Sequence, residues 1–161
     1  MAGVTPAVRV LRQHAVPFTE QHYTYEERGG TRVSSRELGV DEHIVIKTLV
    51  MQDEGKQPLI VLMHGDREVS TKNLARQIGV KAVVPCEAAV AERHTGYQVG
   101  GTSPFGTRKV LPVYVERTIV ALPRILINGG NRGFLVSLAP ADLVRVLSPT
   151  PLDVAIDPEA R

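Results

Sequence analysis

One lysine stands inside an otherwise apolar run. Lys47 lies in the segment 44–51, Ile-Val-Ile-Lys-Thr-Leu-Val-Met, whose composition predicts a strand buried on both faces. Because side chains alternate along a strand, Lys47 points to the same side as Val45, Leu49 and Met51. An ammonium group there costs free energy unless an anion approaches it, which makes Lys47 a candidate for binding an anionic substrate. The alternative is a lysine that protects an exposed or edge strand from mispairing.

A glycine-rich loop is the second candidate. Residues 95–106 read Thr-Gly-Tyr-Gln-Val-Gly-Gly-Thr-Ser-Pro-Phe-Gly. The adjacent Gly100 and Gly101 allow consecutive backbone N–H groups to converge, as in sites that bind an oxyanion or a phosphate, and Pro104 would hold the loop in shape. A purely structural turn is the alternative. The loop is not a dinucleotide fingerprint or a phosphate-binding P-loop, because it lacks their further glycine and Gly-Lys-Ser/Thr.

The sequence offers no protein nucleophile with a recognisable partner. It contains no Ser-His-Asp arrangement and no Gly-x-Ser-x-Gly elbow. Cys86 is interpreted as a structural residue, and His94 as a surface histidine at a helix end. The histidines are scattered, without the His-x-x-x-His or Cys-x-x-Cys spacing of a zinc site. We therefore expect no metal and no cofactor, and a rate that depends on positioning and oxyanion stabilisation.

Composition limits the class of protein. With 161 residues, of which 43% are apolar and 22% charged, the chain fits one globular domain with a single core. Its one cysteine excludes an internal disulfide and fits a reducing cytosol. No apolar run reaches the roughly 18 residues that span a membrane, and the start lacks the layout of a signal peptide. We expect a cytoplasmic protein that does not act at a membrane.

Positive charge is concentrated in one part of the chain. The net charge is only +2, but the segment from Arg93 to Ala141 contains one acid, Glu116, and six cations: Arg93, Arg108, Lys109, Arg117, Arg124 and Arg132. This asymmetry predicts a partner that carries phosphates, such as a nucleic acid, and a solvated basic face is the alternative. Aromatic residues make up 4% of the chain, which argues against a surface that stacks successive bases.

Capping and turn signals divide the chain into short elements. Helices are predicted from Pro6 to His14, from Ser34 to Gly39, from Ser70 or Thr71 to Gly79, from Pro85, and from Pro140 to Leu147. Strands are predicted at 18–25, 44–51, 58–64, 82–84, 110–115, 125–127 and 134–138. Several turns are too short for parallel crossovers, so we predict an α/β fold with a mixed, partly barrel-like β-sheet flanked by helices. Residues 148–161 are predicted to be a surface coil tail of a single domain spanning 1–161.

Four motifs in a fixed order connect these features. They are Thr-Pro-Ala-Val at 5–8, Ile-Lys-Thr-Leu at 46–49, the loop 95–106, and Asn-Gly-Gly-Asn-Arg-Gly at 128–133. Together they closely resemble the YbaK family of free-standing aminoacyl-tRNA deacylases, which is related to the editing domain of bacterial prolyl-tRNA synthetases. The resemblance implies that the chain has the fold of this family and removes mischarged cysteine from tRNA(Pro). It also implies prolyl-tRNA synthetase as a partner.

The resemblance also implies roles for individual residues. Lys47 would be the essential cation, which holds the 3′-terminal phosphate or ribose of the tRNA. Gly100 and Gly101 would bind the ester carbonyl oxygen through their amides, and Thr102 and Ser103 would line the same pocket beside Pro104. The family is thought to use the cysteinyl thiol of the substrate, which attacks its own ester and leaves as a thiolactone. No protein nucleophile is then needed.

Two positions leave the substrate open. Tyr23 and Tyr25 share one face of the strand predicted at 18–25; Tyr23 is preferred as the pocket tyrosine that the resemblance implies, and core packing is the alternative. Leu135 stands where one branch of the family has an acidic residue. The alternatives are therefore a deacylase for alanine or another small amino acid, and a non-catalytic module that binds tRNA or a synthetase.

Overall fold

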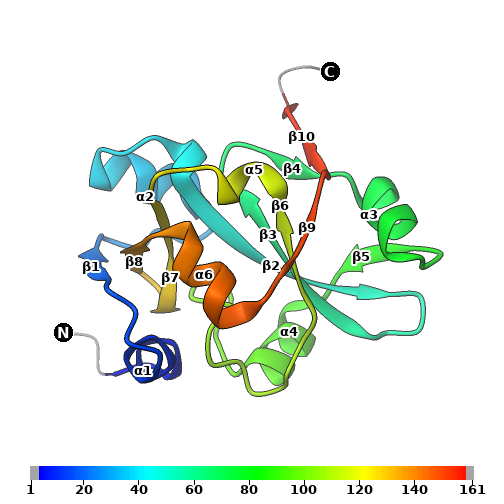
Figure 1. The fold of residues 1–161 in the computed structure, drawn as a ribbon, viewed down its shortest axis with the longest axis horizontal. Helices are drawn as coiled ribbons and strands as arrows, with labels where there is room; N and C mark the ends of the chain where they lie inside the picture. Colours follow the sequence, from blue (N-terminus) through cyan, green and yellow to red (C-terminus); the bar gives the residue numbers. More distant parts are fainter. Residues whose placement is uncertain (1–3, 159–161) are drawn as a thin grey trace.

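Short helices and strands alternate along the chain in the computed structural model, which describes residues 4–158 (Figure 1). The helices are α1 (Pro6–Gln13), α2 (Gly30–Leu38), the 3₁₀ helix η1 (Glu42–Ile44), α3 (Thr71–Ile78), α4 (Ala88–Thr95), α5 (Arg117–Val120) and α6 (Pro140–Leu147). The strands are β1 (Thr19–His22), β2 (Val45–Asp53), β3 (Pro58–His64), β4 (Glu68–Val69), β5 (Val83–Pro85), β6 (Val113–Glu116), β7 (Ile125–Asn131), β8 (Phe134–Leu138), β9 (Thr150–Leu152) and β10 (Ala155–Ile156).

Eight strands form one mixed sheet. Seven follow the order β1-β8-β7-β2-β3-β6-β9, and β5 pairs with β2 outside this path. The pairs β2–β7, β3–β6 and β6–β9 are parallel, and the other pairs are antiparallel. The predicted mixed α/β sheet is therefore confirmed. Among the described residues the sheet does not close into a barrel, because β1 and β9 end it without pairing with each other.

The helix ends follow the local capping chemistry. Thr5 Oγ1 accepts a hydrogen bond from the N–H of Val8 at 3.1 Å, and Ser70 Oγ caps α3 in the same way. Gly39 ends α2 in the left-handed conformation, as predicted. The start of α2 was predicted wrongly at Ser34: its hydroxyl donates to the carbonyl of Thr31 inside the helix, which begins at Gly30.

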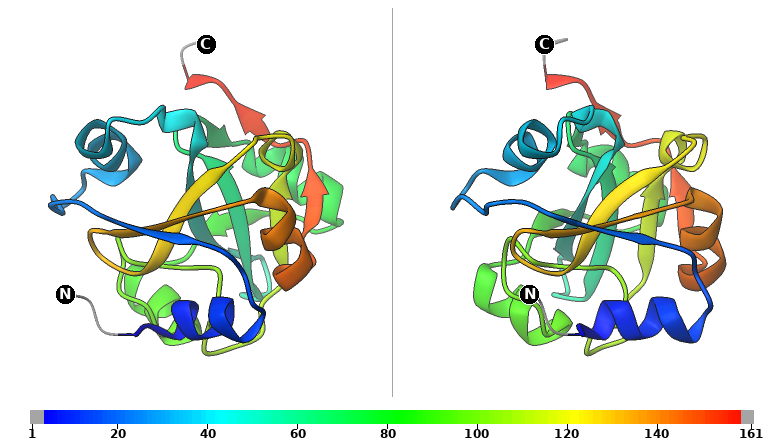
Figure 2. Two further views of the ribbon diagram at one scale, coloured as in Figure 1. Left: turned by 60° about the vertical axis from the view of Figure 1, so that its left-hand side comes forward. Right: turned by 90° about the vertical axis from the view of Figure 1, so that its left-hand side faces the viewer.

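Strand β3 separates two parts of the core because its side chains alternate. Ile60 and Leu62 pack in a cluster that includes residues of α1, α5 and α6. Val61 and Met63 pack on the opposite face with Leu74 of α3. Figure 2 shows α2 above and α1 below the strands β2 and β7. No helix within residues 4–158 is both long and apolar enough to cross a membrane.

The C-terminal segment differs from its prediction as surface coil. β9 extends the main sheet, and Leu152 and Val154 are buried. The buried carboxylate of Glu116 fixes this segment, since its Oε1 accepts the N–H groups of Val154 at 2.8 Å and Ala155 at 2.9 Å. Pro151 is compatible with β9 because that strand lies at the sheet edge, where a missing N–H is tolerated. Residues 159–161 of the predicted tail lie outside the described residues.

Candidate active site

A cavity of about 650 Å³ opens beside β2. One edge of β2 pairs with β3 along most of its length. The other edge pairs with β7 at Val45 and Ile46 and with β5 from Met51 to Asp53, so no strand covers the stretch between them. Side chains and backbone from this stretch line the cavity, which occupies the place of the missing strand.

Lys47 lies in this gap. Its side chain lines the cavity and is half-buried, and no carboxylate of a described residue lies within 4.0 Å of it. Burial lowers the pKa of Lys47, although the negative charges of Glu42, Glu68 and Asp66 act in the opposite direction. The prediction that the segment is buried on both faces holds at Val45, Ile46 and Met51 but not from residue 47 to 50, which line the cavity.

The glycine-rich loop lines the same cavity through Val99, Gly100 and Thr102. Gly100 has a φ of 90°, and a Cβ atom there would lie 2.5 Å from the hydroxyl oxygen of Tyr25. The side-chain amide of Asn128 donates to the carbonyl of Gly100 at 3.3 Å. At Gly101 a Cβ atom would lie 2.7 Å from the backbone nitrogen of Arg132. Both glycines are therefore required by close packing of the loop against neighbouring segments.

The structure brings four of the seven predicted site residues to this cavity: Tyr23, Lys47, Gly100 and Thr102. Gly101 does not line it, and its N–H donates to the carbonyl of Gln98 at 2.8 Å within the turn. Ser103 and Pro104 are buried behind the loop, where Ser103 Oγ accepts the N–H of Phe105 at 3.2 Å. The N–H groups of Gly100 and Thr102 have no acceptor among residues 4–158 and remain available to a ligand.

Two cavity residues were missed or left undecided by sequence reasoning. Tyr25, the alternative to the preferred Tyr23, lines the cavity together with it. Burial raises the pKa of Tyr23, whose N–H is bonded to the carbonyl of Gly133. The guanidinium of Arg132 lies 4.9 Å from the ring centre of Tyr25. Arg132 lies in the motif 128–133, which was the available signal for a second cation at the cavity.

Part of the remaining wall is apolar, and Glu26, Glu27 and Arg28 also line the cavity. Leu135 stands where one branch of the family has an acidic residue. It is 4% exposed and packs with Val45 and Leu126. Cys86 lines the cavity as well, and its thiol lies 3.6 Å from the side-chain oxygen of Gln52. Burial raises the pKa of this thiol, which keeps it protonated near neutral pH and unsuited to nucleophilic attack.

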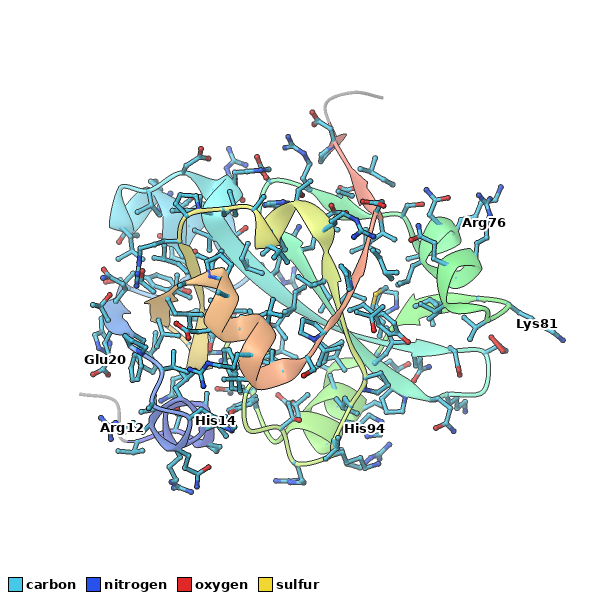
Figure 3. The ribbon with its side chains drawn as sticks, viewed as in Figure 1. Arg12, His14, Glu20, Arg76, Lys81 and His94 are labelled. Atoms are coloured by element: carbon cyan, nitrogen blue, oxygen red, sulfur yellow. The ribbon has the colours of Figure 1, made fainter. Side chains whose placement is uncertain are left out.

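The basic segment does not converge on the cavity. Arg132 lines it, whereas Arg93, Arg108 and Lys109 are exposed near the end of α4. Two further cations bind other side chains: Arg117 bonds to Asp153 and Arg124 to Ser137. His94, labelled in Figure 3, was predicted at the surface but is 7% exposed, and it does not line the cavity.

A second cluster of ionisable groups lies at the other end of β3. The rings of His43 and His64 stack at 3.8 Å, and His43 Nδ1 lies 2.8 Å from Asp66 Oδ1. His64 Nδ1 donates to the carbonyl of His43 at 2.7 Å, while its Nε2 lies 2.7 Å from Thr118 Oγ1. The potential ligand atoms of these three residues lie within 4.8 Å, but in-plane lone pairs of parallel rings do not meet at one point. The cluster is a hydrogen-bond network between the buried His64 and the partly exposed His43 and Asp66.

Comparison with known proteins decides the family. A model described as the aminoacyl-tRNA editing domain matches residues 29–146. The chain belongs to this family. It is 33% identical over 137 residues, 84% of each chain, to the Enterococcus faecalis protein named "Putative Cys-tRNA(Pro)/Cys-tRNA(Cys) deacylase EbsC". The YbaK-type resemblance is thereby confirmed.

The chain is also similar to part of a larger enzyme and, in fold, to a solved structure. The chain is 32% identical over 112 residues to proline–tRNA ligase of Thermodesulfovibrio yellowstonii, covering 68% of the chain and 18% of the ligase. A solved structure titled "a putative trans-editing enzyme for prolyl tRNA synthetase" superposes with a TM-score of 0.80 at 18% identity, over 96% of this chain and 99% of that chain. That likeness shows a shared fold.

Proposed function

We propose that this chain is a trans-editing deacylase that removes mischarged cysteine from tRNA(Pro) in the cytoplasm, alongside prolyl-tRNA synthetase. The observation that carries the proposal is the meeting of Lys47 with Gly100 and Thr102 at one cavity, in a chain of the aminoacyl-tRNA editing family. A cation and unpaired backbone N–H groups at one cavity suit the two polar parts of the substrate, its terminal nucleotide and its ester carbonyl.

In this mechanism the chain positions the substrate and the substrate supplies the nucleophile. Lys47 binds the 3′-terminal phosphate or ribose, and the N–H groups of Gly100 and Thr102 bind the ester carbonyl oxygen. The cysteinyl sulfur bonds to the carbonyl carbon, the bond from that carbon to the ribose oxygen breaks, and the ribose oxygen takes the thiol proton. The products are free tRNA and the cyclic thiolactone of cysteine. Positioning and oxyanion stabilisation account for the rate.

The ionisable groups of the cavity fit a mechanism without a protein nucleophile. Burial raises the pKa values of the Cys86 thiol and the Tyr23 hydroxyl, so both stay protonated near neutral pH. A protonated thiol attacks an ester poorly. The sulfur of the substrate is tethered next to its own carbonyl, which gives it the advantage of an intramolecular reaction.

A second candidate function is deacylation of alanine or another small amino acid. It is favoured by Leu135, which makes the wall apolar where a carboxylate would have selected a polar side chain. An apolar pocket discriminates weakly between small side chains, since each methylene contributes only about 1–3 kcal/mol. A substrate without a thiol also requires an external nucleophile such as water.

The test measures release of amino acid from cysteinyl-tRNA(Pro) and alanyl-tRNA(Pro) by the wild-type chain, Lys47→Met and Lys81→Met. Lys81 is exposed near α3 and does not line the cavity, so its variant controls for loss of one positive charge (Figure 3). Release of cysteine alone, lost only in Lys47→Met, supports the proposal. Release of alanine moves the chain to the second function. Release of neither contradicts both and leaves a binding module.

A further inference from the structure

The uncovered edge of β2 presents main-chain groups as well as side chains to the cavity. Thr48 lies at the centre of the gap and lines the cavity. Its hydroxyl oxygen is buried without a hydrogen-bond partner among the described residues and is not accessible to solvent. The polar groups that Thr48 can offer to a ligand are therefore its backbone N–H and C=O.

The direction of these backbone groups follows from the alternation of an antiparallel pair. The carbonyl of Val45 accepts the N–H of Gly65 at 2.7 Å, on the edge next to β3. The carbonyl of Val50 accepts the N–H of Cys86 at 3.0 Å, on the opposite edge. Odd-numbered residues of β2 therefore bond to β3, and the even-numbered residue Thr48 directs its N–H and C=O away from β3.

No strand completes these two hydrogen bonds. β7 pairs with β2 as far as Ile46, and β5 begins to pair at Met51. No hydrogen bond to the N–H or C=O of Thr48 is formed by the loop residues described between 4 and 158. Unpaired backbone groups of a partly buried strand are costly, and an edge of this kind binds an extended backbone that supplies the missing partner.

We propose that the main chain of Thr48 binds the aminoacyl group of the ester as if it were one residue of a neighbouring strand. The carbonyl of Thr48 accepts a hydrogen bond from the α-amino group, and its N–H donates to the ester carbonyl oxygen. An antiparallel pair exchanges these same two bonds between facing residues. The inference rests on the proposed deacylase function and adds the α-amino group to what the site recognises.

Two consequences follow for the chemistry. A carbonyl oxygen has two lone pairs, so Thr48 and the loop N–H groups of Gly100 or Thr102 together polarise the ester from two sides. The backbone pairing also recognises the α-amino acid unit regardless of its side chain. Discrimination among amino acids then falls to the apolar wall that contains Leu135.

Amide exchange in the full-length chain tests this pairing directly. The probe is cysteinyl-tRNA(Pro) whose terminal adenosine carries a 3′-amide in place of the ester, which cannot be cleaved. Free Thr48 N–H is expected to exchange faster than the N–H groups of Lys47 and Leu49, which bond to β3. Saturation with the probe is expected to slow Thr48 exchange at least about tenfold.

The outcomes separate the inference from the proposed function. Perturbed resonances at Gly100 and Thr102 with unchanged exchange at Thr48 would overturn the inference and leave the site intact. Unperturbed resonances throughout the cavity would overturn the proposed function, and the inference with it. A third outcome is that a 3-mercaptopropionyl probe, which lacks the amino group, slows Thr48 exchange as much as the cysteinyl probe does. This result would support the hydrogen bond from the Thr48 N–H but refute the role of the Thr48 carbonyl.

A kinetic measurement with the wild-type chain gives an independent check. The ester substrates are cysteinyl-tRNA(Pro) and 3-mercaptopropionyl-tRNA(Pro), each rate being divided by that of the uncatalysed ester. Loss of the amino group is expected to lower kcat/KM about 10–100-fold, as for a hydrogen bond to a charged group. Equal normalised values for both substrates would overturn the inference while confirming that the chain is a deacylase.

Discussion

Replacement of Gly101 by alanine tests whether the glycine loop is held in place by its contact with the β7–β8 turn. The added Cβ would lie 2.7 Å from the backbone nitrogen of Arg132 and 2.8 Å from the carbonyl carbon of Asn131. Non-bonded atoms of this kind pack at about 3.5 Å, so the loop and the turn must separate by about 0.8 Å. Backbone on both sides of the contact leaves no flexible side chain to move away.

This separation of the loop from the turn is expected to lower stability modestly and activity strongly. Overpacking of this degree costs about 1–3 kcal/mol of unfolding free energy. It also moves the N–H groups of Gly100 and Thr102 relative to Lys47, which lines the same cavity. Because a misplacement of about 1 Å at a reacting centre lowers a rate about 100-fold, single-turnover deacylation by Gly101→Ala is expected to fall to roughly one hundredth.

Gly96→Ala is the matched control. Gly96 ends α4 with a φ of 79°, so alanine there costs about 1–2 kcal/mol in backbone strain. Its Cβ would meet nothing closer than Arg108 at 3.7 Å, and the loop need not move. Thermal unfolding and deacylation are measured on both variants. Wild-type activity in Gly101→Ala, or an equal loss of activity in Gly96→Ala, would refute this reasoning.

Three further predictions concern ionisable groups. Because burial lowers the pKa of Lys47, deacylation that needs its charge is expected to fall on the alkaline side below pH 10.5, and Lys47→Arg to remove that decline in a pH–rate profile. Burial raises the pKa of Glu116, but hydrogen bonds from Val154, Thr118 and Ala155 outweigh it and lower the pKa overall, so the carboxylate stabilises the fold above pH 4.5. Glu116→Gln is expected to lose about 2 kcal/mol in denaturant unfolding at pH 7, a difference that shrinks as the pH falls below 4.5; a constant difference would contradict this. Burial raises the pKa of Tyr97 to about 12, so wild-type stability is expected to fall above pH 10, and the stability of Tyr97→Phe to fall less steeply over the same range; parallel curves would count against it.

The sequence was sufficient to predict the elements with strong local signals. β3 and α6 match their predicted ranges, α1 begins at Pro6 as predicted, and α3 ends at its predicted cap, Gly79. That Lys47 and the glycine loop line one site was expected only from the family resemblance. No local periodicity relates two segments about fifty residues apart. Leu135 illustrates the same limit: its place in the cavity depends on the register between β7 and β8.

Features set by tertiary contacts were not predictable from the local sequence. β9 owes its place to the carboxylate of Glu116, and prolines around it gave the opposite local signal. Gly101 was expected to present its N–H to substrate, but the turn uses that N–H for the carbonyl of Gln98. The gap beside β2 was not foreseen either, because it results from where β7 and β5 stop pairing. A pattern within one strand contains no information on the length of its neighbours.

The clamp between Glu116 and the C-terminal segment affects how this chain folds during synthesis. β6 acquires its neighbour β9, and Glu116 the N–H groups of Val154 and Ala155, only after residues 150–156 have left the ribosome. Until then the carboxylate of Glu116, which is buried in the folded protein, has to stay hydrated. The edge of β6 that pairs with β9 stays without a neighbouring strand. We therefore expect the addition of β9 to be a late folding step, because it joins segments far apart in sequence. Before that step the nascent chain exposes apolar strands to which chaperones can bind.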